Sequence, residues 1–143
     1  MKKQINNNPD SESSTNFIDG FVLPIPRSQL NEYKRVAKEV AKIWKEHGAL
    51  AYFEYVNEDI TLEGTRSFPE FIDAAEDEAV IFGWVVFASR VMRDRANALV
   101  AADPRMTDLV TPLTNPSRMI FDASRMVYSG FKPLVELNND KAK

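Results

Sequence analysis

Apolar and polar residues alternate along the chain with two different periods, which divide it into strand-like and helix-like segments. Apolar residues at alternate positions predict a strand over residues 17–26 (FIDGFVLPIP), and the aromatic-rich segment 50–56 (LAYFEYV) predicts a second. A continuous uncharged run within 79–90 (AVIFGWVVFASR) predicts a third strand, and a last strand is expected over residues 126–131. Apolar residues three and four positions apart predict an amphipathic helix capped by Ser28 and ended by Gly48, and a second helix over residues 90–102, between Ser89 and Pro104. The order β-α-β-β-α-β is that of an α+β, ferredoxin-like domain, with both helices on one face of an antiparallel sheet.

This topology places the first and third strands at the centre of the sheet. The second helix is expected to turn Met92, Ala96, Leu99 and Val100 toward it. Residues 57–78 follow neither period. Around residues 68–72 they either extend the sheet or form one helical turn.

The third strand is apolar on both faces, and so is the second strand. Helices cover one face of a ferredoxin-like sheet, so the other face of a monomer should be polar. A large exposed apolar face needs a cover, and a second copy of the same sheet supplies one. The chain is therefore predicted to be an obligate homodimer in which two sheets form an α+β barrel.

The two ends of the chain differ in composition from the middle. Residues 1–16 are rich in Asn and Ser and contain few core-forming residues, so they are expected to be a flexible extension that folding does not require. Residues 138–143 are expected to form a flexible tail, which leaves a single domain over residues 17–137. The sequence shows no secretory signal and no apolar run near the roughly 18 residues of a membrane span, so we expect a cytoplasmic protein with no membrane partner.

Charge and cysteine content restrict the possible chemistry. The net charge of -3 gives no electrostatic reason to expect a nucleic-acid partner, although FGWVVF matches part of an RNA-reading strand. The chain has no cysteine, which excludes disulfides, thiolate metal sites and thiol nucleophiles. The acidic run over residues 70–78 lacks the spacing of a metal-binding loop. No glycine-rich phosphate loop or haem motif is recognisable, so we expect neither a metal nor a cofactor.

Several stretches, in order along the chain, resemble one family of bacterial proteins. They are FIDGFVLPIP, KIWKEHGAL, SFP, the third strand, SRVMRDRANALVAADPRM and FDASRMVYSGF, which together span most of residues 17–137. In these stretches the chain is similar to the YbaA-like family, a domain-of-unknown-function family numbered 1428. The resemblance implies the dimeric α+β barrel superfamily, which includes cofactor-independent monooxygenases, chlorite-dismutase-like haem proteins and YciI-like proteins. The family has no established activity, so no catalytic residue is implied. Ala123, Ser124 and Ser129 depart from the glycine or lysine frequent there.

Two residues are candidates for acid–base chemistry. His47 is the single histidine, but its position in the last helical turn before Gly48 suits the helix dipole and explains it without a function. Asp19 shares one face of a central strand with Phe17 and Phe21. It either faces a pocket as an acid or base, or pairs with an arginine such as Arg66 or Arg125 and is structural.

Candidate ligand-binding residues are Phe21, Trp84, Tyr128 and Arg125. Glycine precedes an aromatic residue in three strands, at Gly20, Gly83 and Gly130. These glycines either leave a row of gaps that forms a cavity, or allow a helix to pack closely.

Two classes of function remain open. The first is a homodimeric protein that binds a small apolar or aromatic molecule in a cavity between helices and sheet, including monooxygenase-like or YciI-like enzymes. The second is a non-catalytic interaction or stress-related module. A pocket lined by Asp19, Trp84 and Tyr128 with a bound ligand favours the first class, and a solid interior favours the second.

Overall fold

The computed structural model describes residues 16–138, so the predictions for the two flexible ends fall almost wholly outside the described residues. Four strands form one antiparallel sheet in the order β2-β3-β1-β4. They are β1 (Phe17–Pro26), β2 (Ala51–Val56), β3 (Glu78–Phe87) and β4 (Val127–Phe131). The first and third strands lie at the centre, as predicted, and pair from Phe17 opposite Phe87 to Pro26 opposite Glu78.

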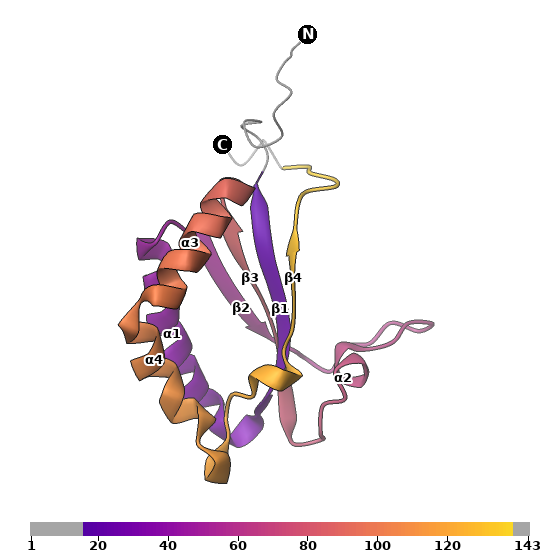
Figure 1. Cartoon of the computed structure of the whole chain (residues 1–143). Coiled ribbons are helices and arrows are strands. Elements are labelled where there is room, and N and C mark those ends of the chain that lie inside the picture. Colours follow the sequence, from indigo (N-terminus) through magenta and orange to yellow (C-terminus); the bar gives the residue numbers. More distant parts are fainter. Residues whose placement is uncertain (1–15, 139–143) are drawn as a thin grey trace.

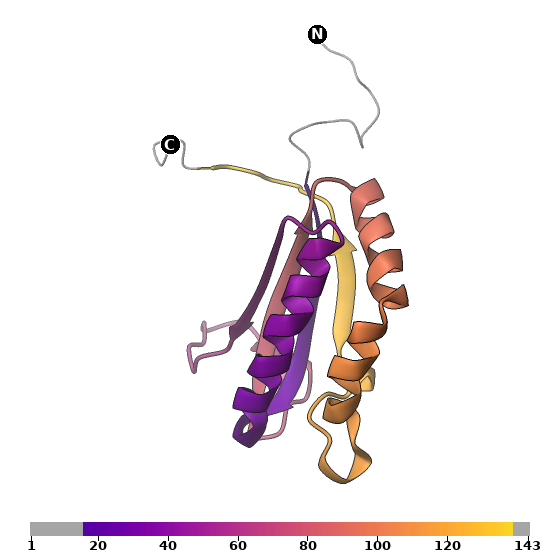
Figure 2. The same cartoon turned by 90° about the vertical axis from the view of Figure 1, so that its left-hand side faces the viewer.

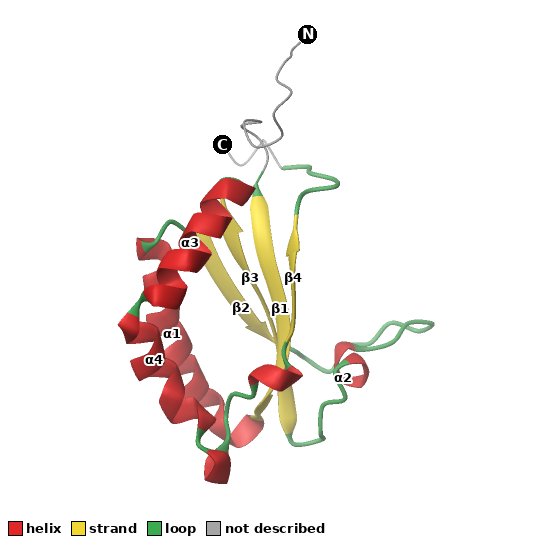
Figure 3. Ribbon diagram, in the orientation of Figure 1, coloured by secondary structure: helices red, strands yellow, loops and turns green. Residues whose placement is uncertain are grey.

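Helices cover one face of this sheet. Figure 1 shows α1 (Leu30–Glu46), α3 (Arg90–Ala102) and α4 (Pro104–Val110) on one side, and the short α2 (Phe68–Phe71) on the other. Figure 2 looks onto the helix layer, where α4 continues from the end of α3 beside α1. Short 3-10 turns at Arg27–Gln29, Thr111–Thr114, Pro116–Arg118 and Ala123–Arg125 complete the chain. The two layers in Figure 3 confirm the predicted ferredoxin-like β-α-β-β-α-β fold.

The helix ends agree with the sequence in part. Ser89 caps α3 by accepting a hydrogen bond from the Met92 amide at 3.2 Å, as predicted. Ser28 does not cap α1, because it lies in the 3-10 turn that precedes the helix. Pro104 does not simply end the helical path. It is the first residue of α4, whose cap is Asp103.

The inner face of α3 is narrower than predicted. Ala96 and Val100 are buried, but Leu99 is 40% exposed. The prediction that Leu99 faces inward is therefore wrong, because the helix turns it toward solvent.

Within residues 57–78 there is one helical turn and no additional strand, and the last residue, Glu78, already begins β3. Ser67 and Glu70 cap α2 reciprocally, each side chain bonding the other's backbone amide at 3.2 Å. Behind this turn, the buried Ile72 packs with Val22 and Val80. This segment covers one end of the helix-free face (Figure 1).

The core between sheet and helices consists of two clusters. One joins β1 and β3 to α1 and the chain after α4, and the other joins β3 to α3. Phe21 packs against both clusters. The candidate site lies around this residue.

No helix within residues 16–138 has the length and apolar character needed to cross a bilayer.

Candidate functional site

A cavity of about 410 Å³ lies between the helices and the sheet. Its floor is the helix-facing side of the sheet, where two adjacent rows of cross-strand neighbours lie. Glu54, Phe21 and Tyr128 line the cavity from one row, and Tyr52, Val85 and Asp19 line it from the other. The remaining walls are mainly apolar side chains of α1, α4 and the chain before β4. They are Tyr33, Val36, Ala37, Val40, Trp44, Met106, Val110, Leu113, Phe121 and Met126, with Leu23 and Asn97.

The glycines of the sheet do not form the row of gaps that was considered. Gly83 and Gly130 face the helices, whereas Gly20 lies on the helix-free face, because it pairs with Trp84 and Ser129. Rings of neighbouring strands fill each position, and a Cβ added at Gly83 would lie 2.5 Å from the Phe21 ring. The cavity therefore lies above the sheet, where Phe21 forms part of its floor.

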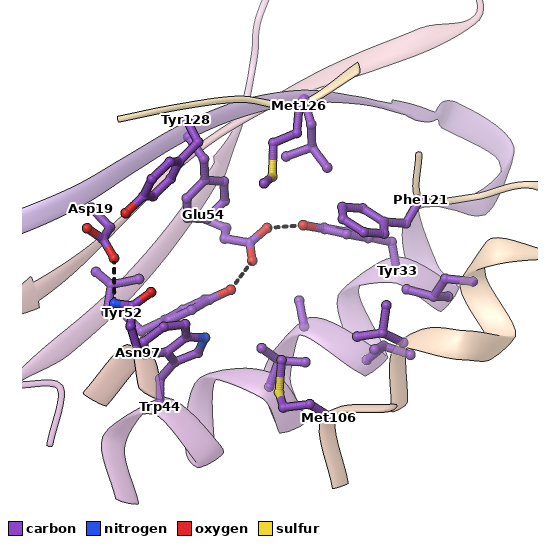
Figure 4. Close-up of a pocket in the computed structure, with 18 residues that line it drawn as sticks. Asp19, Tyr33, Trp44, Tyr52, Glu54, Asn97, Met106, Phe121, Met126 and Tyr128 are labelled. Carbon is purple, nitrogen blue, oxygen red and sulfur yellow. Dashed lines mark hydrogen bonds between the residues drawn. The ribbon is translucent and has the colours of Figure 1, made fainter. Parts of the chain in front are cut away.

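The polar centre of the cavity is Glu54 on β2. The Tyr33 hydroxyl from α1 donates to one carboxyl oxygen, Oε1, at 2.5 Å, and the Tyr52 hydroxyl donates to Oε2, also at 2.5 Å. Figure 4 shows the carboxyl group between these two hydroxyls, in the middle of the lining residues. Burial raises the pKa of Glu54, and the two hydrogen bonds oppose this shift. Glu54 is thus a mostly buried carboxyl group held between two neutral hydroxyl donors.

The local sequence explains why Glu54 points inward. In β2, side chains alternate between the faces, so Tyr52, Glu54 and Val56 share the helix side. Burial, followed by the negative charge of Glu54, raises the pKa of Tyr33. Both tyrosines stay protonated and act as donors. The sequence contains a signal for this site, because Glu54 is an acid on the same face of its strand as Tyr52 and Val56. The candidate residues predicted from the sequence do not include it.

Asp19 lies at one end of the cavity and is buried. Arg93 on α3 donates from Nε to Oδ1 at 2.8 Å, and Asn97 donates from Nδ2 to Oδ2 at 3.1 Å. Arg93 also donates to the Tyr128 hydroxyl. The arginine beside Asp19 is thus Arg93, and the proposed partners Arg66 and Arg125 were wrong. The pairing with Arg93 was not predictable from the sequence, because the second helix lies far from Asp19 along the chain.

The other ligand-binding candidates divide between the two sides of the sheet. Phe21 and Tyr128 line the cavity together with Asp19. Trp84 lies on the helix-free face, where its ring stacks on Tyr55 at a centroid distance of 5.4 Å. Arg125 is outside the cavity and pairs with Glu78 at 2.6 Å. The structure therefore brings Phe21, Tyr128 and Asp19 together and separates Trp84 and Arg125 from them.

His47 is the residue that ends α1 and does not line the cavity. Its Nε2 lies 2.8 Å from Oδ2 of Asp103, the residue between α3 and α4. Arg105 binds the same carboxylate at 2.7 Å. Hydrogen bonds from Arg105 and His47 hold the pKa of Asp103 well below its usual range. This partner of His47 was not predictable, because Asp103 is 56 residues away along the chain.

Within residues 16–138, no three His, Asp or Glu side chains converge in a way that could hold a metal ion. Two acids of the run over residues 70–78 have structural partners. Glu70 caps α2, and Glu78 binds Arg125.

Comparison with solved structures finds a similar fold in uncharacterised proteins. A NIPSNAP family protein with unknown function from Agrobacterium tumefaciens superposes with a TM-score of 0.52 at 17% identity, over 82% of this chain and 87% of that chain. An uncharacterized NIPSNAP-like domain protein from Burkholderia xenovorans gives 0.50 at 12% identity, over 87% and 90%. At these identities the likeness concerns the fold alone.

Comparison of the sequence is more specific. The profile of a family described as a protein of unknown function, DUF1428, matches residues 16–123. The uncharacterized protein YbaA of Escherichia coli K12 is 32% identical over 120 residues, which are 84% of this chain and 97% of that protein. The chain therefore belongs to the DUF1428 family.

Proposed function

We propose that the protein is a homodimer that binds a small, mainly apolar or aromatic molecule in the cavity between sheet and helices. The observation that carries this proposal is the partly open cavity of about 410 Å³ between sheet and helices. Small-molecule sites have a volume of about 300–1,000 Å³ and combine apolar walls with a few placed polar groups. A solid interior would have favoured an interaction module without a ligand.

The distribution of polar groups narrows the ligand class. Apolar side chains and aromatic rings such as Trp44 and Phe121 form most of the walls. Glu54 offers hydrogen-bond acceptors in the middle, and the charge of Asp19 is already compensated by Arg93. A planar, neutral molecule with one hydroxyl group matches this arrangement.

The helix-free face supports the homodimer. Phe53, Tyr55 and Phe82 are 39%, 59% and 46% exposed, and their rings gather around Trp84 at centroid distances of 5.1 to 5.5 Å. Monomeric proteins rarely expose a contiguous apolar patch of this kind. A second sheet of the same chain would cover these rings by a two-fold symmetric contact. The net charge of -3 makes a nucleic acid a poor occupant of the same face.

Native mass spectrometry of gently purified protein tests the ligand proposal. We expect a retained small molecule in the native protein and in a Val91→Phe control, whose substitution lies on the exposed part of α3. A Val40→Phe variant, which adds volume inside the cavity, should lose the molecule. Added 4-nitroanisole should quench the fluorescence of Trp44, which lines the cavity. A protein with no retained molecule and no quenching by this neutral aromatic probe would overturn the proposal.

A further inference from the structure

We propose that Glu54 is a proton acceptor, which takes the proton of an ionisable hydroxyl group on a ligand in the cavity. This inference rests on the proposed function and names its substrate class as phenols and enols. The proton moves from the ligand oxygen to a carboxyl oxygen of Glu54. The ligand O–H bond breaks, a carboxyl O–H bond forms, and the ligand keeps the electron pair as a phenolate or enolate.

The first argument is the hydrogen-bond capacity of the carboxylate. An ionised carboxylate has about four acceptor positions on its two oxygens. Tyr33 and Tyr52 use one position on each oxygen of Glu54. These two hydroxyl donors also fix the orientation of the Glu54 carboxylate. The remaining positions are available to a ligand in the cavity that Glu54 lines.

The second argument is the contrast between the two acids of the cavity. Asp19 binds a cation on Oδ1 and an amide on Oδ2, so its charge is compensated. The partners of Glu54 are two neutral hydroxyls, and no ion pair involves it in the part of the chain that the structure describes. A carboxylate that lacks a cation in apolar surroundings gains more from taking up a proton. Burial raises the pKa of Glu54 accordingly.

The third argument is a route by which the proton reaches solvent. A second hollow of about 510 Å³ lies outside the cavity, between α1 and the edge strand β2. Tyr33, Tyr52 and Glu54 line both spaces, so their hydrogen-bonded bridge forms part of the wall between them. Lys34 and Lys38 lie along the outer hollow and are exposed. When a ligand fills the cavity, Glu54 cannot exchange its proton with solvent on that side. Because Glu54 also lines the outer hollow, it can exchange the proton there.

The test uses 4-nitrophenol, whose absorption band moves to longer wavelength when its hydroxyl group loses the proton. 4-Nitroanisole is the matched probe that has no such proton. At a pH where free 4-nitrophenol is protonated, the native protein should bind it with a nitrophenolate band. The native protein should also bind 4-nitrophenol about tenfold more tightly than 4-nitroanisole, since one hydrogen bond to a charged group contributes about this much to affinity.

Glu54→Gln should abolish the nitrophenolate band and the preference while 4-nitroanisole still binds. Glu58→Gln is the matched control, because it removes one negative charge from an exposed position just after β2. Its spectrum should equal that of the native protein. If native protein and Glu54→Gln bind both probes alike and with the same spectrum, Glu54 is not the acceptor, although the cavity still takes aromatic ligands. If the native protein binds neither probe, the proposed function is overturned and this inference with it.

Discussion

The carboxylate of Asp19 on β1 and the guanidinium of Arg93 on α3 lie 2.8 Å apart, from Oδ1 to Nε, at one end of the cavity. Asn97, one turn further along α3, holds the other carboxylate oxygen. Both oxygens of this buried acid are therefore satisfied by one helix. The pair joins a central strand to the helix layer at this end of the cavity.

Replacing Asp19 by Asn should destabilise the fold, because the change removes the buried one of the two carboxylates that Arg93 binds. Removing one partner of a fully buried ion pair costs about 3–5 kcal/mol of stability. Because water reaches Arg93, we expect a smaller loss of about 2 kcal/mol. Urea unfolding measures the loss. Asp94→Asn is the control, since Asp94 also binds Arg93 at 3.0 Å but is 52% exposed. It should cost about 0.5 kcal/mol or less. Unchanged stability together with weakened binding of 4-nitroanisole would instead make Asp19 a ligand-binding residue.

Phe82→Glu should convert the proposed homodimer into a monomer. The substitution places a charge among the exposed rings of the helix-free face, where a partner sheet would have to bury it. Light scattering over a dilution series gives the mass. Val91→Glu makes a comparable change on α3, across the sheet, and should leave the mass unchanged. A native protein that stays monomeric and folded at micromolar concentration contradicts the dimer.

The fold was predictable from the sequence because its signals are local. The alternation in FIDGFVLPIP and the three- and four-residue spacing in α1 each specify an element from its own residues. Residues 57–78 were left open, because the capping box of Ser67 and Glu70 supports a single turn that is too short to show a period.

The site was less predictable because it depends on pairs that are distant in sequence. Arg93 reaches Asp19 across 74 positions, and nothing in either segment distinguishes it from Arg66 or Arg125. Trp84 and Phe21 lie on opposite faces because of the register between β1 and β3, in which Phe21 faces Gly83. Glu54 was overlooked, although an acid on the inner face of β2 was visible in the alternation.

His47→Gln should cost about 1 kcal/mol or less and leave binding to the cavity intact. The glutamine can still donate to Asp103, and Arg105 keeps that carboxylate paired at 2.7 Å. Thermal unfolding and quenching of Trp44 by 4-nitroanisole check the two parts. A folded variant that has lost binding would show that the contact between His47 and Asp103 shapes the cavity through α4.

Gly83→Ala should destabilise the protein by about 1–3 kcal/mol, the usual cost of an overpacked core. The added Cβ would lie 2.5 Å from the Phe21 ring and 2.7 Å from the backbone oxygen of Phe53, and the backbone cannot move aside easily. Gly20→Ala is the matched control in the neighbouring strand. Its Cβ would meet the ring of Phe131 at 3.1 Å, and that ring is half exposed and free to shift. Urea unfolding should give a clearly smaller loss for Gly20→Ala. Equal losses would mean that strand propensity, and not the Phe21 contact, determines the cost.

The stability of the protein should depend on pH because Glu54 titrates, and the burial of Glu54 determines whether stability rises or falls with pH. Burial raises the pKa of Glu54 in the folded protein above the ordinary value of 4.5. As the pH rises above about 4.5, the unfolded chain releases this proton first, so the folded state holds more protons and loses stability with rising pH. Below that value both states are protonated, and the penalty is absent.

Glu54→Gln removes this titration and keeps an acceptor for one of the two tyrosine hydroxyls. We therefore expect the free energy of unfolding of the variant, relative to native protein, to increase from acid toward neutral pH. Urea unfolding at a series of pH values measures this difference, in which the other titrating groups cancel. Glu58→Gln, at an exposed position, should show a flat difference. A flat difference for Glu54→Gln as well would show that water reaches the carboxylate in the folded protein, and that Glu54 lacks the environment a proton acceptor needs.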